Sequence, residues 1–239
     1  MNKTVLITGG SRGIGACAVY EFARRGYNVA FTYLNSKENA ENLAKKTGAC
    51  PILCDVSNSS DVNKAIELAT STFGKIDILI NNAGISEFSL FTDITDEMWH
   101  KMIETNLSSA FYASRAILPQ MISRKNGVII NISSMWGQVG ASCETHYSVS
   151  KAGLIGLTKA LAKEVGPSGI RVNCICPGTI DTEMNAHLSS DDKEALINDT
   201  PLGKIGRCED VVNSLIFLSE DSSSFITGQI LGVNGGFII

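Results

Sequence analysis

Two side chains that could exchange a proton with a substrate, Tyr147 and Lys151, lie four residues apart. In a helix, residues i and i+4 share a face, so the two side chains would lie together. The pKa of free tyrosine is about 10, and a nearby ammonium group lowers it by stabilising the phenolate. This spacing is weak evidence alone, because any helix can carry it by chance. Ser134 strengthens it, because it follows a strand-like run and its hydroxyl could donate to a substrate carbonyl oxygen.

A glycine-rich turn at Thr8–Gly15 could bind the pyrophosphate of a dinucleotide. It lies between a strand-like run and a helical pattern, with the spacing G-x-x-x-G-x-G. Glycines let the backbone turn tightly and approach a phosphate, which the following helix N-terminus stabilises. A glycine turn without a ligand is the alternative. The residues of this turn expected to contact the cofactor are Gly9, Ser11, Arg12, Gly13, Ile14 and Gly15.

Two further strand ends carry residues suited to the same ligand. Asp55 and Val56 follow one predicted strand, where the carboxylate could accept a hydrogen bond from an adenine amino group. A helix-capping role for Asp55 is the alternative. Asn82, Ala83 and Gly84 follow the next strand and would let a cofactor approach the backbone closely. Because carboxyl ends of parallel strands meet at one edge, the three strand ends together predict a dinucleotide site.

The end of the second predicted strand favours NADP over NAD. An NAD site normally places an acidic residue there to bind the ribose hydroxyl. Here no acid follows Tyr33 until Glu38. Arg12 could form a charge-assisted bond to a 2′-phosphate, and Asn35, Ser36 and Lys37 could help to bind it. The sequence therefore predicts NADPH/NADP+ as the cofactor.

Alternating strand and helix patterns are expected to position these residues. They are typical of βαβ units, so we expect an α/β fold, with a doubly wound parallel sheet of about seven strands in one domain over residues 1–239. An irregular polar segment at 183–200 is expected to form a substrate lid. The predicted strands are Thr4–Thr8, Asn28–Tyr33, Cys50–Cys54, Ile76–Ile80, Gly127–Ile132, Arg171–Cys176 and Gln229–Val233. The predicted helices are 13–25, 37–46, 60–73, 96–124, 147–165 and 208–219, with Ser36 and Asp61 near helix starts.

Composition argues against several classes of protein. The 239 residues carry a formal net charge of −4 with 18% charged residues, which offers no basic face for nucleic acid. No signal peptide precedes the first strand, and no apolar run is long enough to span a membrane. Seven cysteines without CxxC pairs, and only three histidines, favour free thiols and no metal site. We expect a cytoplasmic protein with a small-molecule substrate.

The chain resembles the short-chain dehydrogenase/reductase family in its single-domain form, over essentially its whole length. The motifs are the Thr8–Gly15 turn, Asp55, Asn81–Gly84 and the Tyr147–Lys151 pair. The resemblance implies four catalytic positions and a loop that holds the nicotinamide amide. The implied catalytic positions are Asn106, Ser134, Tyr147 and Lys151, with Asn106 holding a water in a proton relay through Lys151 to Tyr147. The implied nicotinamide loop contains Pro177, Gly178, Ile180 and Thr182.

Within that family, the segments Asn131–Ser134 and Ser150–Lys159 resemble β-ketoacyl-ACP reductases most. Those enzymes commonly use two basic residues to bind the acidic carrier protein. Here one of these positions carries Lys125 and the other carries Ser168. The substrate expected from the resemblance is a small ketone, carried on acyl carrier protein.

The loop from Met135 to His146 resembles a subgroup that reduces a 5-aminopentanone group on a lysine of elongation factor P. Glu144 lies three residues before Tyr147, where ketoacyl reductases tend to carry an amide. We hypothesise that Glu144 recognises an amine on the substrate; a solvent-facing loop acid is the alternative. Trp136 is interpreted as a wall of the substrate pocket, with loop packing as the alternative.

Further alternatives concern oligomeric state and chemistry. His146 is interpreted as incidental, because Tyr147 and Lys151 already supply acid–base chemistry. A stripe of small residues on the helix 147–165 fits either core packing or a partner helix, in keeping with a homodimer or homotetramer. The stripe consists of Val149, Gly153, Gly156 and Ala160. A non-catalytic NADP-binding regulator is the alternative from another class of protein, and the intact catalytic set argues against it.

Overall fold

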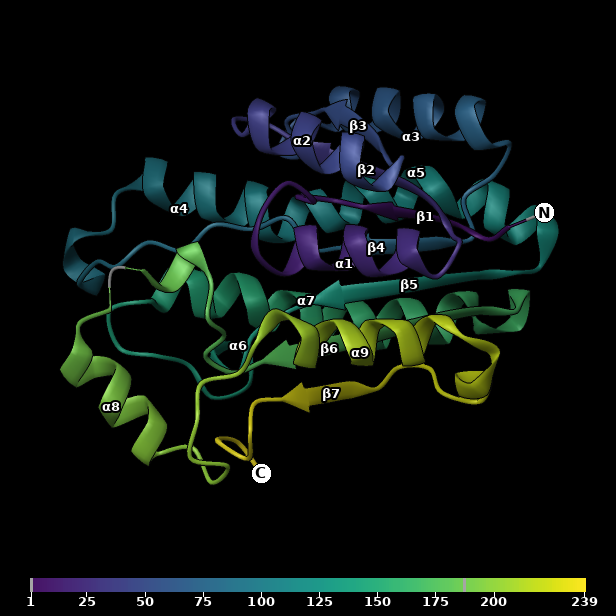
Figure 1. Cartoon of the computed structure of the whole chain (residues 1–239). Coiled ribbons are helices and arrows are strands. Elements are labelled where there is room, and N and C mark those ends of the chain that lie inside the picture. The colour runs from purple at the N-terminus through teal and green to yellow at the C-terminus, as the bar shows by residue number, and fades with distance from the viewer. Residues whose placement is uncertain (1, 187) are drawn as a thin grey trace.

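A sheet of seven parallel strands, covered by helices on both faces, forms the structure (Figure 1). The computed structural model describes residues 2–186 and 188–239. The strand order is β3-β2-β1-β4-β5-β6-β7. The strands are β1 (Thr4–Ile7), β2 (Asn28–Tyr33), β3 (Cys50–Leu53), β4 (Ile78–Asn81), β5 (Gly127–Ile132), β6 (Ile170–Pro177) and β7 (Ile230–Val233).

Helices connect these strands and extend beyond them. The α-helices are α1 (Gly13–Arg24), α2 (Lys37–Thr47), α3 (Ser59–Phe73), α4 (Asp96–Ile103), α5 (Ser109–Arg124), α6 (Trp136–Val139), α7 (Thr145–Val165), α8 (Ser190–Asn198) and α9 (Cys208–Ser219). Shorter turns are the 3-10 turns η1 (Phe91–Asp93), η3 (Gly166–Ser168), η4 (Glu183–Asn185) and η5 (Asp221–Ser223), and the π turn η2 (Glu104–Ser108).

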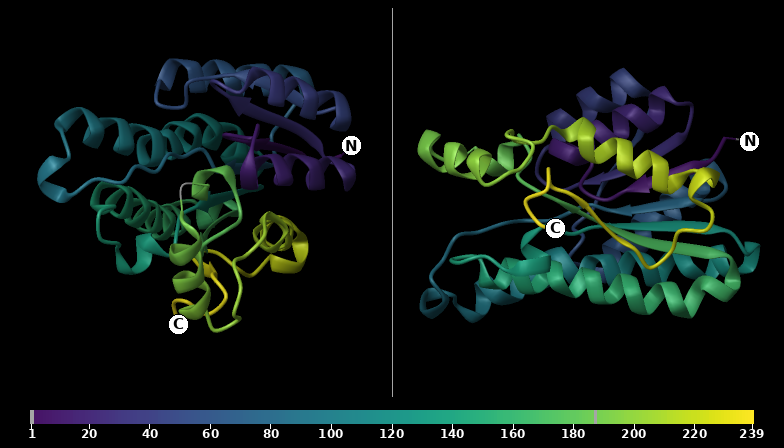
Figure 2. Two further views of the ribbon diagram at one scale, coloured as in Figure 1. Left: turned by 60° about the vertical axis from the view of Figure 1, so that its left-hand side comes forward. Right: turned by 90° about the horizontal axis from the view of Figure 1, so that it is seen from below.

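Both faces of the sheet are buried, which explains why the strand sequences are apolar runs rather than alternating patterns. Val5 and Ile7 of β1 pack in the core formed with α1, α2 and α9. Leu6 points to the other face and packs in the core formed with α3, α5 and α7. Figure 2 shows α9 and α7 on opposite sides of the sheet. The predicted doubly wound α/β arrangement is therefore confirmed.

The strand order reverses at β1, which lies between β2 and β4. In an open parallel sheet, such a reversal leaves a crevice at the carboxyl ends of the two strands, where ligands bind. The glycine-rich turn follows β1, and the segment that begins at Asn82 follows β4. The topology thus places two of the motifs at the position where a dinucleotide site is expected.

The helix predicted over 96–124 is wrong in one respect, since it is interrupted. The π turn η2 separates α4 from α5 and contains Asn106. A π turn inserts one residue into the helical repeat and often marks a functional site. The helix predicted over 147–165 is α7, and it begins at Thr145 rather than at Tyr147. The segment 183–200, predicted to form a lid, contains η4 and the helix α8.

Two predicted helix starts also differ in detail. The side chain of Asn58, rather than Asp61 or Asp55, caps α3 by accepting hydrogen bonds from the N–H groups of Ser60 and Asp61. Ser36 occupies the N-cap position of α2, but its side chain makes no capping hydrogen bond. Asn is as good a cap as Asp, because both place a short oxygen acceptor over the first turn.

Candidate active site

The structure brings the four predicted catalytic residues together at the carboxyl edge of the sheet. Tyr147 and Lys151 lie on the first turns of α7, and the Lys151 Nζ atom is 5.6 Å from the centroid of the Tyr147 ring. Ser134 follows β5 and its hydroxyl is hydrogen-bonded to Tyr147. All three side chains are buried. A β-carbon placed on Gly84 would lie 3.2 Å from Lys151 Nζ and 3.3 Å from Asn106 Oδ1, so the chain passes close beside both.

Asn106 clamps the segment that leaves β4. Its Oδ1 atom accepts a hydrogen bond from the Ile85 N–H at 2.8 Å, and its Nδ2 atom donates to the Ile85 carbonyl at 2.9 Å. Nδ2 also donates to Ser150 Oγ on α7 at 3.0 Å. The Asn106 side chain, which belongs to the π turn, therefore connects the segment after β4 with α7.

Burial shifts the pKa values of the acid–base pair in opposite directions. Burial raises the pKa of Tyr147 to about 12, while the Ser134 hydrogen bond lowers it and the charge of Glu144 raises it. Burial lowers the pKa of Lys151 to about 8, because removing a cation from water favours its neutral form. The sequence predicts a Tyr147 pKa below that of free tyrosine, and this is wrong for the net shift, because burial is the largest influence and raises the pKa. At neutral pH Tyr147 is protonated, which is the form that donates a proton.

The glycine turn has the backbone of a phosphate-binding loop. Gly9 and Gly13 have φ values of +66° and +53°, which residues with a β-carbon rarely adopt. A β-carbon on Gly15 would collide with the Gly9 carbonyl oxygen. The Arg12 side chain makes no capping hydrogen bond to α1, so it leaves the first N–H groups of that helix to other acceptors. These features fit a dinucleotide pyrophosphate, because a cradle without side chains lets phosphate oxygens reach the backbone.

Asn82 holds the glycine turn in place. Its Nδ2 atom donates to the carbonyl oxygens of Thr8 and Gly9, both at 3.0 Å. The Thr8 hydroxyl accepts hydrogen bonds from the N–H groups of Asn82 and Ala83 at 3.0 and 3.1 Å. Sequence reasoning missed this use of Thr8. The Thr8 side chain and Asn82 thus position the binding loop, while Ala83 and Gly84 keep the neighbouring backbone open.

Asp55 lies after β3 in a tight local turn. Its Oδ1 atom accepts hydrogen bonds from the N–H of Ser57 at 2.9 Å and from its hydroxyl at 2.6 Å. This turn holds the carboxylate at the strand end beside Val56, which is buried. Since Asn58 caps the following helix, the capping alternative for Asp55 is wrong.

The groups predicted to meet a 2′-phosphate lie near the surface. The Arg12 side chain is 60% exposed, and its guanidinium lies 3.9 Å from the Glu183 carboxylate of the lid segment. Asn35 is exposed, Ser36 is half-buried, and Lys37 pairs with Glu41 at 3.7 Å. Arg12 is therefore free to turn toward an anion at the end of β2, at the cost of a weak exposed ion pair.

The segment after β6 faces the glycine turn from the other side. A β-carbon on Gly13 would lie 3.6 Å from the Thr182 methyl group. Ile180 forms a backbone bridge with Gly206, and its carbonyl accepts a hydrogen bond from Asn185 Nδ2 at 2.8 Å. The Gly178 N–H donates to the β7 backbone at 3.0 Å. Pro177 ends β6, so the whole predicted nicotinamide loop begins at the sheet edge.

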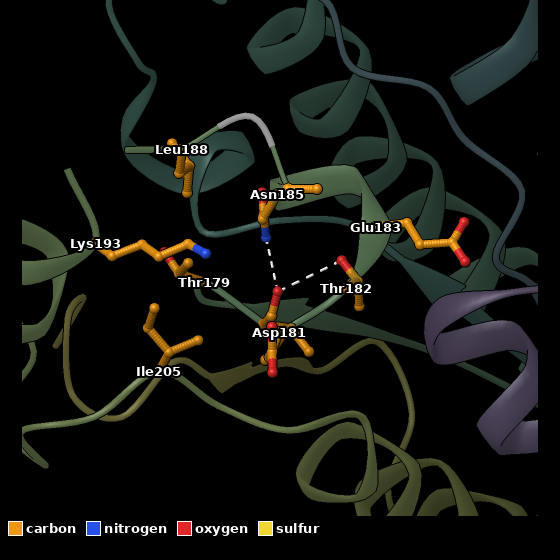
Figure 3. A pocket seen from close by; sticks show the side chains of 10 residues that line it. Thr179, Asp181, Thr182, Glu183, Asn185, Leu188, Lys193 and Ile205 are labelled. Carbon is orange, nitrogen blue, oxygen red and sulfur yellow. Dashed lines mark hydrogen bonds between the residues drawn. The ribbon is translucent and has the colours of Figure 1, made fainter. Parts of the chain in front are cut away.

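A cavity of about 330 Å³ lies under the lid segment, beside this loop (Figure 3). Lys193 of α8 and Asn185 of η4 extend into it, and Ile205 closes it from the opposite side. The predicted lid therefore covers a space continuous with the nicotinamide loop.

Glu144 is a buried carboxylate close to Tyr147. Its side chain is buried, with 6% of the residue exposed, and its Oε1 atom accepts a hydrogen bond from Ser86 Oγ at 2.7 Å. Its charge reaches Tyr147 and raises the pKa of that residue. The alternative of a solvent-facing loop acid is therefore wrong. The partner Ser86 was missed because no sequence pattern connects two loops 58 residues apart.

Trp136 is half-buried and stacks edge-on against Phe237 at a centroid distance of 5.5 Å, so part of its surface packs on the C-terminal tail. The backbone N–H of Trp136 donates to Ser134 Oγ at 3.2 Å, which keeps the backbone of Trp136 beside Ser134. His146 is fully buried, and within the described residues neither ring nitrogen has a hydrogen-bond partner.

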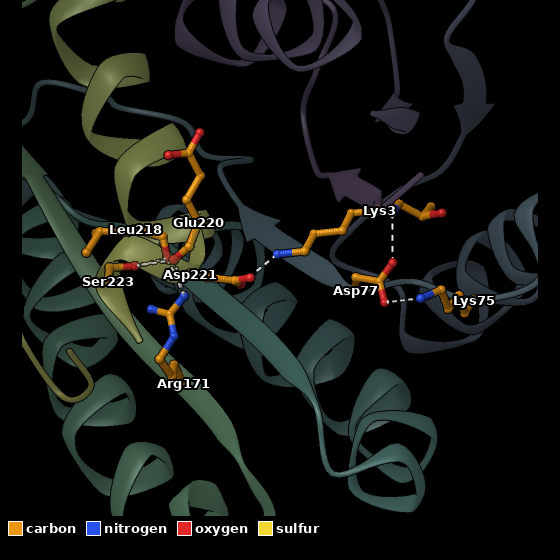
Figure 4. A network of polar contacts seen from close by, with 9 residues as sticks. Lys3, Lys75, Asp77, Arg171, Leu218, Glu220, Asp221 and Ser223 are labelled. Atoms are coloured by element: carbon orange, nitrogen blue, oxygen red, sulfur yellow. Dashed lines mark hydrogen bonds and ion pairs between the residues drawn. The ribbon is translucent and has the colours of Figure 1, made fainter. Parts of the chain in front are cut away.

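A second polar cluster lies at the opposite, amino edge of the sheet (Figure 4). Asp77 accepts a hydrogen bond from the Thr4 N–H at 2.9 Å and pairs with Lys75 at 2.9 Å. Arg171 donates to the Leu218 carbonyl at 2.7 Å. These groups satisfy one another and tie strand starts together, so this edge serves the fold. Among the described residues there is no cluster of side chains able to hold a metal ion, and no helix long and apolar enough to cross a membrane.

The site combines three features: a parallel sheet whose strand order reverses at β1, a glycine turn at that reversal, and a buried Tyr–Lys pair beside the turn. This combination is typical of nicotinamide-dependent oxidoreductases.

A family model described as enoyl-(acyl carrier protein) reductase matches residues 9–238. The 3-oxoacyl-[acyl-carrier-protein] reductase FabG of Chlamydia muridarum is 42% identical, over 99% of this chain and 97% of its own. FabG of Staphylococcus aureus strain N315 is 40% identical, over 99% of this chain and 98% of its own.

The chain belongs to the short-chain dehydrogenase/reductase family. It is an oxidoreductase that acts on a keto or hydroxyl group and is similar to 3-oxoacyl-ACP reductases. This confirms the resemblance predicted from the motifs.

The pKa of Lys151 predicts how ketone reduction depends on pH. Lys151 is charged below its pKa of about 8 and neutral above it. Because the ammonium stabilises the phenolate left after Tyr147 donates its proton, kcat/KM for reduction should fall as pH rises, with half of the loss near pH 8. A pH profile from 6 to 10 measures this. Lys151→Arg should lower the rate but remove the inflection, since guanidinium stays charged. A wild-type rate that is constant to pH 10 would contradict the assignment.

Proposed function

We propose that this chain reduces a ketone to an alcohol with NADPH, as one reductase domain in which residues 183–200 form the lid. The observation that carries the proposal is the buried set of Ser134, Tyr147 and Lys151 next to the glycine turn. Bound NADPH supplies the hydride. The turn would hold its pyrophosphate, Asp55 and Val56 its adenine, and the loop from Pro177 to Thr182 its nicotinamide amide.

Three side chains then bind the ketone oxygen, protonate it and stabilise the charge that remains. The Ser134 hydroxyl donates a hydrogen bond to the oxygen, which gains negative charge during reduction. Tyr147 is protonated at neutral pH and gives its proton to that oxygen. The Lys151 ammonium stabilises the resulting phenolate. Since the Asn106 side chain is occupied by Ile85 and Ser150, a relay water there would bind to the main chain.

The preference for NADPH rests on the end of β2 and on Arg12. No acidic residue lies between Tyr33 and Glu38 to accept from a ribose hydroxyl or repel a phosphate. Asn35 and Ser36 add hydrogen-bonding groups at the same place. The exposed side chain of Arg12 supports the same preference.

Arg12→Gln tests the cofactor preference. Hydrogen bonds to charged groups are worth about 1.5–3 kcal/mol, so kcat/KM for NADPH should fall by roughly 10- to 150-fold. The value for NADH should change by less than about threefold, because NADH has no 2′-phosphate for this residue to bind. Steady-state kinetics with both cofactors measures the ratio. An equal loss with NADPH and NADH would show that Arg12 acts on something other than the 2′-phosphate.

The substrate is proposed to be a keto group attached to a carrier. The relatives named 3-oxoacyl-[acyl-carrier-protein] reductase support a β-ketoacyl group on acyl carrier protein. A second candidate is the 5-aminopentanone group on a lysine of elongation factor P. The observation that favours it is the buried Glu144 carboxylate beside Tyr147, because a carboxylate in a low-dielectric pocket attracts an ammonium group strongly. Trp136 would form part of the same pocket.

Glu144→Gln separates the two candidates. If the substrate carries an amine, kcat/KM for a lysine-linked amino ketone should fall by roughly 10- to 100-fold, since a neutral amide cannot balance the ammonium charge. Turnover of an acetoacetyl thioester should change by less than about threefold. Glu67→Gln, an exposed position on α3, serves as the control. Equal effects of Glu144→Gln on both ketones would contradict the amino-ketone candidate.

We propose that the chain acts in the cytoplasm as a homodimer or homotetramer. The proposed oligomer rests on the exposed surfaces of α5 and α7. Phe111 and Val149 are 44% and 42% exposed. A β-carbon on Gly156 would meet nothing within 4 Å, whereas one on Gly153 would meet Leu107 at 2.6 Å. Gly153 thus packs inward, while Val149 and Gly156 lie on a surface that a partner helix can approach closely.

A further inference from the structure

Three large apolar side chains are exposed on the segment that follows β4. Phe88, Leu90 and Phe91 are 56%, 60% and 70% exposed, and together they are called the apolar rim. Large contiguous apolar surface is unusual on a soluble protein and marks sites of binding.

The apolar rim belongs to a segment anchored directly on the catalytic residues. The N–H of Ile85 donates to Asn106, and the hydroxyl of Ser86 donates to Glu144. Three residues later, the Ser89 N–H donates to the Cys143 carbonyl at 2.9 Å. A partner on the rim would therefore lie immediately beside the mouth of the active site.

The charges around the rim are almost all of one sign. Residues 85–98 contain four carboxylates and no lysine or arginine, and residues 181–194, which overlap the lid segment, contain five carboxylates and one lysine. These two segments, called the acidic arms, thus hold nine of the 24 acidic residues but one of the 20 basic residues. The remaining chain is net positive, so the excess negative charge is concentrated here. The acidic residues of the arms are Glu87, Asp93, Asp96, Glu97, Asp181, Glu183, Asp191, Asp192 and Glu194.

Both acidic arms lie at the same end of the molecule. Figures 1 and 2 show η1 with α4, and η4 with α8, beyond the carboxyl ends of the strands. Eight of the nine carboxylates are exposed, and Glu87 is half-buried. Exposed charges of one sign raise the local concentration of oppositely charged partners and repel partners of like charge.

We infer that the apolar rim and the acidic arms form a docking surface for a protein that presents its ketone on a basic, partly apolar surface. This inference rests on the proposed ketone reduction, and of the two proposed substrates it favours the lysine-linked amino ketone over a group carried on acidic acyl carrier protein. An acidic carrier would meet like charge on both sides of the mouth. A cationic carrier gains electrostatic attraction from the arms and apolar burial from Phe88, Leu90 and Phe91.

Two synthetic carriers test this surface. One ketone is attached to a lysine- and leucine-rich peptide and to a glutamate- and leucine-rich peptide of equal length, and the same ketone is also supplied free. At low ionic strength, wild-type kcat/KM should be at least about tenfold higher with the cationic carrier, and added salt should remove this preference. Reduction of the free ketone should not depend on salt. Failure to reduce the free ketone would reject the proposed function itself.

Charge-neutralising variants assign the preference to the arms. The double variant Asp93→Asn/Glu97→Gln should lower kcat/KM for the cationic carrier by roughly three- to tenfold, through a higher KM. The kcat/KM for the free ketone should not change. Phe91→Ala should also raise KM for the cationic carrier. Glu67→Gln/Glu164→Gln, exposed positions on α3 and α7, is the matched control and should change nothing. The inference is rejected if the anionic carrier is used equally well or if the control loses as much as the arm variant.

Discussion

The hydrogen bonds between the ends of β1 and β4 are the constraint on which the site depends. The Thr8 hydroxyl accepts from the backbone of Asn82 and Ala83, and the Asn82 amide donates back to Thr8 and Gly9. These bonds fix the glycine turn against the strand end at which the topology reverses. From there the chain runs past Gly84 to the Asn106 clamp, so one network sets both the dinucleotide cradle and the position of α7.

Burial then gives the two catalytic side chains different protonation behaviour. The same removal of water raises the pKa of the Tyr147 phenol and lowers that of the Lys151 ammonium, because each group is driven toward its neutral form. The phenol is thus held as a proton donor, and the lysine titrates close to physiological pH. The fold supplies this by placing both groups on the buried face of α7, under the loops that follow β4 and β5.

Much of the fold could be predicted from the sequence, because the strands are apolar runs and the central strands β1, β4, β5 and β6 are almost wholly buried. The candidate catalytic residues could also be grouped from the sequence, since Tyr147 and Lys151 share one helix and Ser134 follows a strand. Sequence could not reveal the π turn at 104–108, because apolar periodicity continues through it. It also missed the Ser86–Glu144 bond, which joins two loops and depends on the final packing.

The central claim is that Tyr147 donates the proton in a site that binds the cofactor independently of it. Tyr147→Phe removes only the hydroxyl and keeps the ring that packs on α7. The account predicts that the Kd for NADPH, measured by fluorescence titration, stays within about threefold of the wild-type value, while kcat for ketone reduction falls by about 10²- to 10⁴-fold. Turnover close to that of the wild type would show that another group supplies the proton and would contradict the account.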